Sequence, residues 1–228
     1  MKRFLTTLAI AAPLCMPLVK AADGMEEHNK RIHEAATTLR ELVDAGDRGI
    51  PEDLMRRAQC VGVIPNLKRV GLIVGAKYGK GELVCRTPNG WSAPATMRIE
   101  GGSIGVQIGA GETDVVFLVM NKTGEEKLMR DHFTMGADAT VAAGPVGRDA
   151  SAQTDAMMAA EIMAWSRARG VFGGVTLEGA TLRPDRDDDA KIYGRAVSTH
   201  EIINGVVTAP PAAADMYHVL DRFPYKER

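Results

Sequence analysis

Residues 91–121 read WSAPATMRIEGGSIGVQIGAGETDVVFLVMN, and this stretch decides the fold. Its glycines recur among apolar residues, at Gly101, Gly102, Gly105, Gly109 and Gly111. In strand-like sequence, such glycines mark bulges, tight bends or places where a ligand or another backbone comes close. The apolar run 114–120 has the length of a strand and indicates a buried central strand. The stretch therefore predicts a sheet that bends sharply.

Further short strands are predicted on the N-terminal side of this stretch. Residues 60–64, 70–77 and 82–86 are rich in β-branched and apolar residues. Pro65-Asn66 and Gly79-Lys80-Gly81 are typical of turns and are expected to separate these strands. Pro88-Asn89-Gly90 is a hairpin signal that leads into Trp91.

Helical patterns lie mainly towards the two ends of the chain. They cover residues 25–44, 50–59, 123–131, 190–193, 199–203 and 212–222. Residues 162–166 have helical composition around them but are predicted to be a strand, and residues 171–182 form a strand interrupted by glycines. Together these patterns predict a single α+β domain. Its core is a strongly curved, mostly antiparallel or barrel-like sheet, with N-terminal and C-terminal helices.

The first 21 residues have the pattern of a secretory signal peptide. Lys2 and Arg3 precede an apolar stretch, and cleavage is expected after Ala21. Residues 22–228 then form the single domain, in a protein exported to the periplasm or outer membrane, or secreted. Cys15 follows Leu14, whereas lipid attachment requires a small residue before the cysteine, so lipidation is not favoured.

The charge of the chain argues against one class of function, and its cysteines allow a disulfide. The formal net charge is −1, and cleavage would remove three basic residues and lower it to −4. This balance argues against a nucleic-acid-binding protein, which carries a strongly basic face. An oxidising compartment would permit a disulfide between Cys60 and Cys85. Two separate buried thiols are the alternative, because free cysteine packs as a small apolar residue.

Several separated motifs resemble one known family. The strings WSAPA, GGSIGVQIGAGETDVVFLVMN, GADATVAAGPVG and ARGVFGGVTLEGA occur in the order found in the SYLF lipid-binding family, over about residues 57–205. That family includes eukaryotic endocytic adaptors, often with an SH3 or FYVE domain, and exported bacterial proteins. The resemblance implies membrane and phosphoinositide binding, with actin binding in some eukaryotic members. It also identifies this chain as an exported bacterial member that is not an enzyme.

A group of basic residues precedes the glycine-rich stretch. Glu82 is the only acid between residues 61 and 99. The candidate lipid-binding residues in this locally positive region are Lys68, Arg69, Lys77, Lys80, Arg86 and Arg98. Lys80 lies in a predicted glycine-flanked turn, where backbone N–H groups would help to bind an anion. An ordinary charged surface is the alternative. With the resemblance, the group predicts a patch that binds anionic phospholipid at a membrane surface, without any cofactor.

Other functions have weaker support in the sequence. Gly101–Gly105 fits G-x-S-x-G, which would make Ser103 the nucleophile of an acyl hydrolase, but the required helix does not follow. The acidic run 185–189 lacks the glycine and distant glutamate of a calcium loop and favours a solvated turn. The scattered histidines do not support a zinc site, so no metal is expected. A structural envelope or host-contact protein is a third possibility.

Some residues are expected to serve the fold. Gln107, Asp114 and Asp138 are predicted to be buried hydrogen-bond partners of glycine-rich turns. Gly105 and Gly109 are predicted at positions where a Cβ would clash or where φ is positive. The apolar stripe of the first helix is rich in alanine and lacks Trp and Phe, which favours packing in the core over insertion into a membrane.

Overall fold

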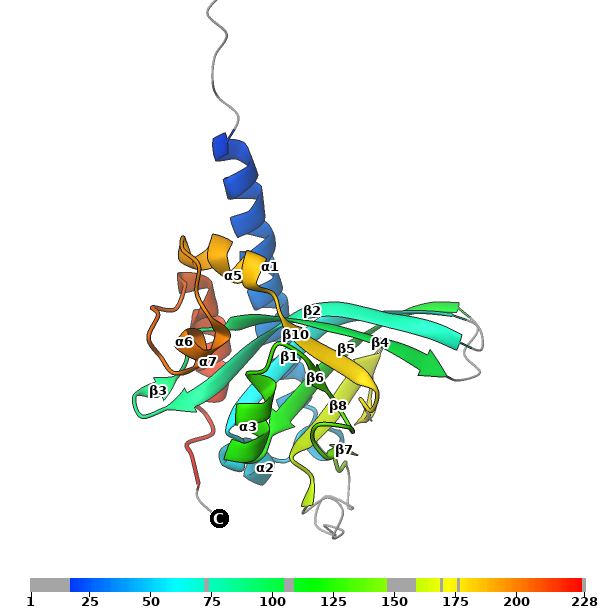
Figure 1. Cartoon of the computed structure of the whole chain (residues 1–228). Coiled ribbons are helices and arrows are strands. Elements are labelled where there is room, and N and C mark those ends of the chain that lie inside the picture. Colours follow the sequence, from blue (N-terminus) through cyan, green and yellow to red (C-terminus); the bar gives the residue numbers. More distant parts are fainter. Residues whose placement is uncertain are drawn as a thin grey trace, which may run out of the picture.

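Helices lie at both ends of the chain, and the strands form one sheet between them (Figure 1). The computed structural model describes residues 17–71, 74–104, 109–146, 159–168, 170–175 and 177–226. The helices are α1 (Pro17–Val43), η1 (Gly46–Arg48), α2 (Glu52–Arg57), α3 (Lys122–Leu128), α5 (Arg186–Tyr193), α6 (Thr199–Ile203), η3 (Pro211–Ala213) and α7 (Ala214–Leu220). The strands are β1 (Cys60–Gly71), β2 (Val74–Thr87), β3 (Gly90–Trp91), β4 (Ala95–Ile104), β5 (Gly109–Val119), β6 (Phe133–Thr134), β7 (Val141–Ala143), β8 (Ile162–Ala168), β9 (Val171–Gly174) and β10 (Ala180–Pro184).

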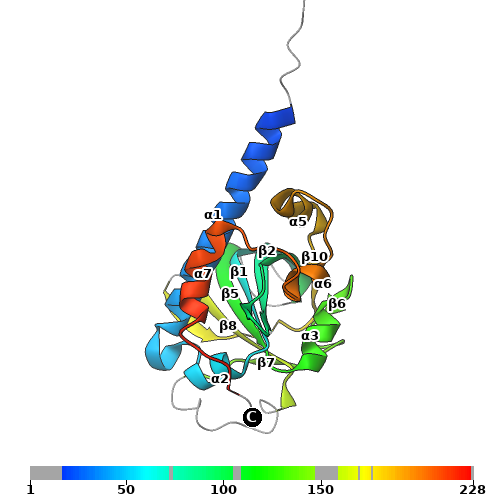
Figure 2. The same ribbon diagram turned by 90° about the vertical axis from the view of Figure 1, so that its left-hand side faces the viewer.

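In the described part of the chain, the sheet has ten strands and is mostly antiparallel. Its order is β6-β10-β4-β2-β1-β5-β8-β7, with β3 paired to β2 and β9 paired to β8. Within the described residues, β7 and β8 are the one parallel pair of named strands. The sheet curls strongly, with α1 and α7 on one side and α3 and α6 on the other (Figure 2). The predicted single α+β domain with a curved sheet and terminal helices is therefore confirmed, as is a strand at residues 162–166.

Each face of the sheet packs its own apolar core because successive strand residues point to opposite faces. We call the side covered by α1 and α7 the α1 face; its core includes Val84 and Leu118. We call the other side the α6 face; its core includes Phe117 and Phe133 together with Ile202 of α6.

Helix α1 packs on the first of these cores. Ile32, Ala35, Ala36, Leu39 and Leu42 are all buried, and they recur at the spacing of one helical face. Core packing of this helix, as the sequence favoured, is confirmed. No helix in the described part of the chain is both long and apolar enough to cross a membrane.

Two predicted turns are wrong. Pro65 and Asn66 lie inside β1, and Gly79–Gly81 lies inside β2, so that one long hairpin replaces three short strands. Asn66 adopts a φ of 52°, and its backbone N–H donates to Asp114 at 2.8 Å. The strand register shifts at this point, which identifies a β-bulge and not a chain reversal.

The glycines of the second false turn are needed for close packing between strands. A Cβ added at Gly81 would lie 2.0 Å from the carbonyl oxygen of Val63, and one at Gly79 would lie 2.9 Å from Ile64. Glycine leaves room where two neighbouring strands approach each other closely, and the local sequence of such a site resembles that of a turn. Lys80 therefore sits in a strand, not in an anion-binding turn.

The predictions for the fold-supporting residues have mixed outcomes. Asp114 accepts the bond from Asn66, and Asp138 accepts from the backbone N–H of Thr134 at 2.6 Å, so both serve as hydrogen-bond partners. Gln107 and Gly105 lie outside the described residues. Gly109 begins β5 opposite Gly71, and its proposed tight fit stays a prediction.

A different glycine gives a sharper test of packing. A Cβ at Gly62 would meet the buried ring of Phe117 at 2.0 Å, so we expect Gly62→Ala to lower the free energy of unfolding by about 2 kcal/mol through overpacking. Gly102→Ala is the matched control, because nothing lies within 4 Å of its added Cβ. Urea denaturation of both variants measures the difference, and equal midpoints would contradict this packing.

The two remaining cysteines are bonded to each other. Cys60 and Cys85 are directly opposite in β1 and β2, their Cα atoms lie 4.0 Å apart, and a disulfide joins them. Of the two alternatives left open by the sequence, the structure has the bridge.

Candidate functional site

Four strands form a projecting arm (Figure 1), and β10 pairs with β4 at the base of this arm, at Glu100 and Gly101. We define the arm as residues 68–71, 74–78, 100–104 and 109–113, from β1, β2, β4 and β5. Strand β8 pairs with β5 only from Asp114 onward, so it does not support the arm. Every arm residue whose exposure is described is exposed or half-buried. The arm thus presents both of its faces to the surroundings.

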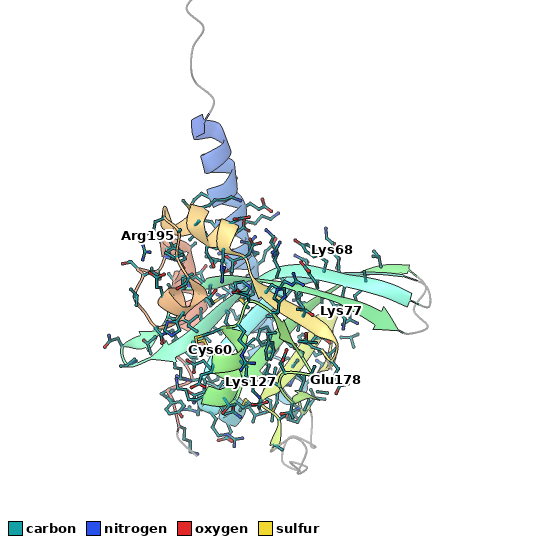
Figure 3. All side chains as sticks on the ribbon, in the orientation of Figure 1. Cys60, Lys68, Lys77, Lys127, Glu178 and Arg195 are labelled. Carbon is teal, nitrogen blue, oxygen red and sulfur yellow. A yellow bond between two sulfur atoms is a disulfide. The ribbon has the colours of Figure 1, made fainter. Side chains whose placement is uncertain are left out.

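The arm brings together three of the six predicted cations. Arg69 and Lys77 are directly opposite each other in β1 and β2, and Lys68 is opposite Tyr78. Because neighbouring residues of a strand alternate, Lys68 lies on the α1 face and Arg69 and Lys77 lie on the α6 face. Figure 3 shows Lys68 and Lys77 on opposite sides of the arm. Val70 is 55% exposed and Tyr78 is 46% exposed on the face that carries Lys68.

The three cations of the arm are poorly neutralised. Within the described ranges, no ion pair includes Lys68, Arg69 or Lys77, and the buried Nε of Arg69 has no hydrogen-bond partner. Burial, and next the neighbouring Arg69 guanidinium, lower the pKa of Lys77. The arm is therefore a place where an added anion would relieve repulsion.

Lys80 and Arg98 have partners of their own. The Nζ of Lys80 lies 2.8 Å from both Asp185 and Asp188, and the Nε of Arg98 lies 3.7 Å from Asp185. Burial opposes the charged form of Lys80, but hydrogen bonds to the two aspartates outweigh it and raise its pKa. The acidic run is thus neither a solvated turn nor a free calcium loop, because its carboxylates anchor α5 to the sheet.

Arg86 lies away from the arm and holds the polypeptide together. Its guanidinium group donates to the backbone oxygens of Ala58 at 2.9 Å and Phe223 at 2.8 Å. It also stacks over the ring of Trp91, 4.2 Å from the centroid. These contacts tie the C-terminal segment to β2 and give Arg86 a structural role.

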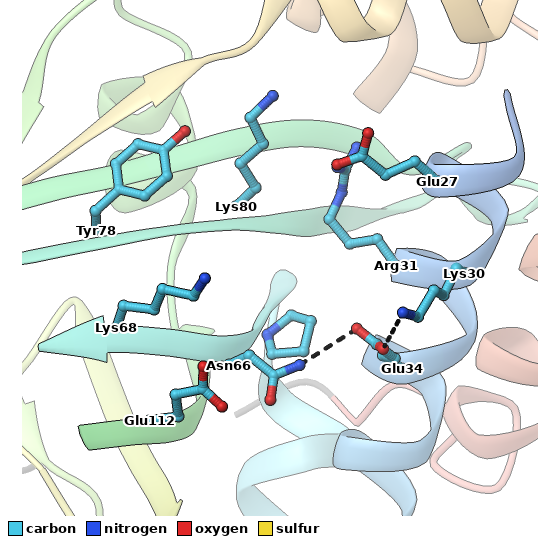
Figure 4. A pocket seen from close by; sticks show the side chains of 10 residues that line it. Glu27, Lys30, Arg31, Glu34, Asn66, Lys68, Tyr78, Lys80 and Glu112 are labelled. Atoms are coloured by element: carbon cyan, nitrogen blue, oxygen red, sulfur yellow. Dashed lines mark hydrogen bonds and ion pairs between the residues drawn. The ribbon is translucent and has the colours of Figure 1, made fainter. Parts of the chain in front are cut away.

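A polar groove of about 490 Å³ separates α1 from the base of the arm (Figure 4). Charged residues of both elements line it, together with three uncharged residues: Glu27, Lys30, Arg31, Glu34, Lys68, Lys80 and Glu112, with Pro65, Asn66 and Tyr78. Across it, the side-chain amide of Asn66 donates to Glu34 at 3.3 Å. Because the charges are mixed, the groove has no single preference for an anion, in contrast to the α6 face of the arm.

A buried ion pair joins α1 to the sheet beside this groove. The Nε of Arg31 donates to Glu82 at 2.9 Å, and another of its nitrogens donates to Nδ1 of His28 at 3.1 Å. Burial, and next the charge of Arg31, lower the pKa of His28 to about 4, so the ring is neutral near pH 7. Burial raises the pKa of Glu82 to about 7, although Arg31 opposes this shift.

The second buried acid of this region behaves like Glu82. Asp189 is fully buried and accepts a hydrogen bond from the backbone N–H of Thr96 at 2.8 Å. Burial raises its pKa to about 7 as well. The sequence analysis missed this network; the one available signal was Glu82, a lone acid within an otherwise basic and apolar stretch.

Glu82 should make stability depend on pH. Its pKa is raised in the folded state, so its stabilising contribution is complete below about pH 4.5 and is lost as pH rises through about 7. We therefore expect Glu82→Gln to gain stability relative to the parent between pH 5 and pH 7.5, by roughly 1 kcal/mol per unit. Denaturation at several pH values measures this, and a constant difference between the two proteins would refute it.

The described structure does not support the alternative in which Ser103 is the nucleophile of an acyl hydrolase. Ser103 lies near the end of β4, and the next described element is the strand β5. A nucleophile elbow needs a helix directly after the serine. Gly105, the last residue of the motif, lies outside the described residues.

Comparisons with known proteins agree with the motifs in the sequence. A family model described as "Ysc84: Las17-binding protein actin regulator" matches residues 100–223. The human SH3 domain-containing YSC84-like protein 1 is 31% identical over 200 residues, which cover 85% of this chain and 58% of that protein. LAS seventeen-binding protein 3 of Saccharomyces cerevisiae is 32% identical over 183 residues, covering 78% of this chain and 40% of that protein.

The yeast relative is named as a binding protein and the human relative for its SH3 domain, and neither name is that of an enzyme. The chain spans only 58% and 40% of their lengths, so their names describe proteins with additional segments. The family model, in contrast, matches more than half of the present chain and includes the second half of β4, all of β5 and the C-terminal helices. The chain therefore belongs to the Ysc84 family, the SYLF family that its motifs resemble.

Proposed function

We propose that this protein binds without catalysis to membrane surfaces that contain anionic phospholipid, and that the arm is its contact site. One observation carries the proposal: Lys68, Arg69 and Lys77, which have no ion-pair partner in the described part of the chain, lie together on a projecting arm. Val70 and Tyr78 are exposed beside Lys68, on the face opposite Arg69 and Lys77, and would reach the apolar side of the interface. Exposed apolar residues next to cations suit a surface with anionic headgroups above acyl chains.

The attraction should be local because the protein as a whole is not basic. The formal net charge is −1, so distant parts of the chain do not favour an anionic surface. Each Lys or Arg near such a surface contributes about 1 kcal/mol, and the effect fades within about 10 Å at 0.1 M salt. A projecting arm keeps its cations close to the bilayer while the acidic α5 region stays further away.

We expect the triple variant Lys68→Gln/Arg69→Gln/Lys77→Gln to bind anionic vesicles about a hundredfold more weakly, since it loses three such contributions. Sedimentation with phosphatidylglycerol vesicles measures the affinity, and phosphatidylcholine vesicles provide the neutral comparison. Parental binding should weaken as salt rises.

The control variant Lys122→Gln/Arg222→Gln/Lys226→Gln removes the same charge from exposed positions off the arm. It should sediment like the parent. Equal losses in both triple variants would mean that net charge, not the arm, governs binding. A triple arm variant that binds like the parent would place the membrane contact elsewhere.

We further propose that the protein acts in a bacterial cell envelope, after export and removal of residues 1–21. The support is the signal-like sequence of these residues together with the disulfide between Cys60 and Cys85, which suits an oxidising compartment. N-terminal sequencing of protein from the native host tests this. A mature N-terminus upstream of Ala21, or recovery in the cytoplasmic fraction, would contradict it.

A further inference from the structure

The α6 face of the arm has a floor made almost entirely of glycine. Arg69 and Lys77 form the centre of a row whose flanking positions are Gly111 on β5 and Gly101 on β4. The next row outward has Gly109, Gly71 and Gly75 in adjacent strands. Glycines in a strand leave room for close approach of a ligand to the backbone.

The cation pair on this floor is costly without a ligand. Like charges directly opposite each other in neighbouring strands repel and destabilise the sheet. The flanking glycines supply no carboxylate, and a Cβ built at Gly111 meets nothing within 4 Å, so the space beside Arg69 is open. A Cβ built at Gly101 would lie 3.1 Å from Gly179 and Ala180, so the start of β10 bounds the surface on the side of Lys77. The Nε of Arg69 has no hydrogen-bond partner in the described structure, although it is shielded from solvent.

We propose that this glycine-floored surface is a binding slot for a single phosphate group, held between Arg69 and Lys77. The guanidinium group would supply paired N–H donors and the ammonium group a point charge, which together suit the oxygens of a phosphate. The glycines let the atoms attached to the phosphate lie flat on the backbone. The phosphate could belong to a lipid headgroup or be a free ion. This inference rests on the proposed membrane function only in the first case.

The slot can be blocked without removing any charge. Gly111→Val adds a side chain beside Arg69 on the α6 face, at a position with open space. Gly102→Val is the matched control, because it is equally unobstructed but pairs with Ala76 on the α1 face. Valine suits a strand, so both variants should fold. Lys77→Met is a further variant that removes one cation and adds no bulk near the glycines.

The experiment follows the NMR signals of the Arg69 Nε–Hε group and the Lys77 side chain. The two probes are inorganic phosphate and monomeric dihexanoyl phosphatidylglycerol, each titrated into the parent and the three variants. We expect saturable shifts in the parent and in Gly102→Val, and affinities weakened by about tenfold or more in Gly111→Val and Lys77→Met. Binding of both probes identifies a general phosphate slot; binding of the lipid alone identifies a headgroup slot.

Two results would overturn the slot. One is the absence of a saturable shift with either probe in the folded parent. The other is a Gly111→Val variant that binds like Gly102→Val. Vesicle sedimentation on the same samples separates this inference from the proposed function. Vesicle binding without a slot signal leaves membrane attraction intact, and slot binding of phosphate without vesicle binding refutes the membrane function alone.

Discussion

Arg31→Met should lower the free energy of unfolding by about 3–5 kcal/mol, the largest effect expected of any substitution considered for this protein. Arg31 bonds to Glu82 at 2.9 Å, and the Glu82 side chain is completely buried. Methionine keeps most of the side-chain volume but leaves a carboxylate in the interior without its partner. Chemical denaturation near pH 8, where Glu82 is ionised in the folded state, measures the full effect.

Two controls separate this pair from a general effect of substitution in α1. Lys30→Met changes an adjacent residue whose side chain is 75% exposed, and it should be nearly neutral. The double variant Arg31→Met/Glu82→Leu removes both charges and should recover much of the lost stability. If the double variant is as unstable as the sum of the two single variants, the two side chains are not coupled and the explanation fails.

Removal of the disulfide should have the second-largest effect. Cys60 and Cys85 are separated by 25 positions, and a closed loop of this size corresponds to about 3.5 kcal/mol of chain entropy in the unfolded state. The Cys60→Ala/Cys85→Ala variant should therefore unfold at a much lower denaturant concentration than the oxidised parent. Alkylation of the unfolded parent without reductant, followed by mass spectrometry, should find no free thiol at either position.

The control for the alanine variant is the parent protein after reduction of its disulfide, which has the same side chains at every other position. The reduced parent and the alanine variant should have similar midpoints, both well below that of the oxidised parent. A reduced parent as stable as the oxidised one would show that the bridge does not constrain the unfolded chain. In that case the β1–β2 pairing alone would fix the geometry around the cysteines.

Much of the architecture could be predicted because the relevant signals are local. The apolar run 114–120 became β5, and the periodic pattern of α1 identified its buried face. The turns at Pro65-Asn66 and Gly79–Gly81 were predicted wrongly, since residues typical of turns serve a bulge and a close strand contact there. The sequence does not show whether a glycine bends the chain or makes room for a neighbouring strand.

The cation site was only partly predictable for a related reason. Composition located a basic region, but the grouping of Lys68, Arg69 and Lys77 depends on strand register, which the bulge at Asn66 sets. Lys80 and Arg98 lie in the same basic region, yet they meet aspartates from α5, about a hundred residues further along the chain. Long-range partners of this kind leave no signal in the local sequence.

The arm also separates recognition from stability in thermodynamic terms. Its described residues belong to neither apolar core, so its backbone hydrogen bonds should open in sub-global fluctuations while the domain stays folded. Substitutions in the arm should therefore change the free energy of unfolding of the whole domain only slightly. The side chains of the arm can then vary widely during evolution, because the two apolar cores and the disulfide stabilise the fold without them.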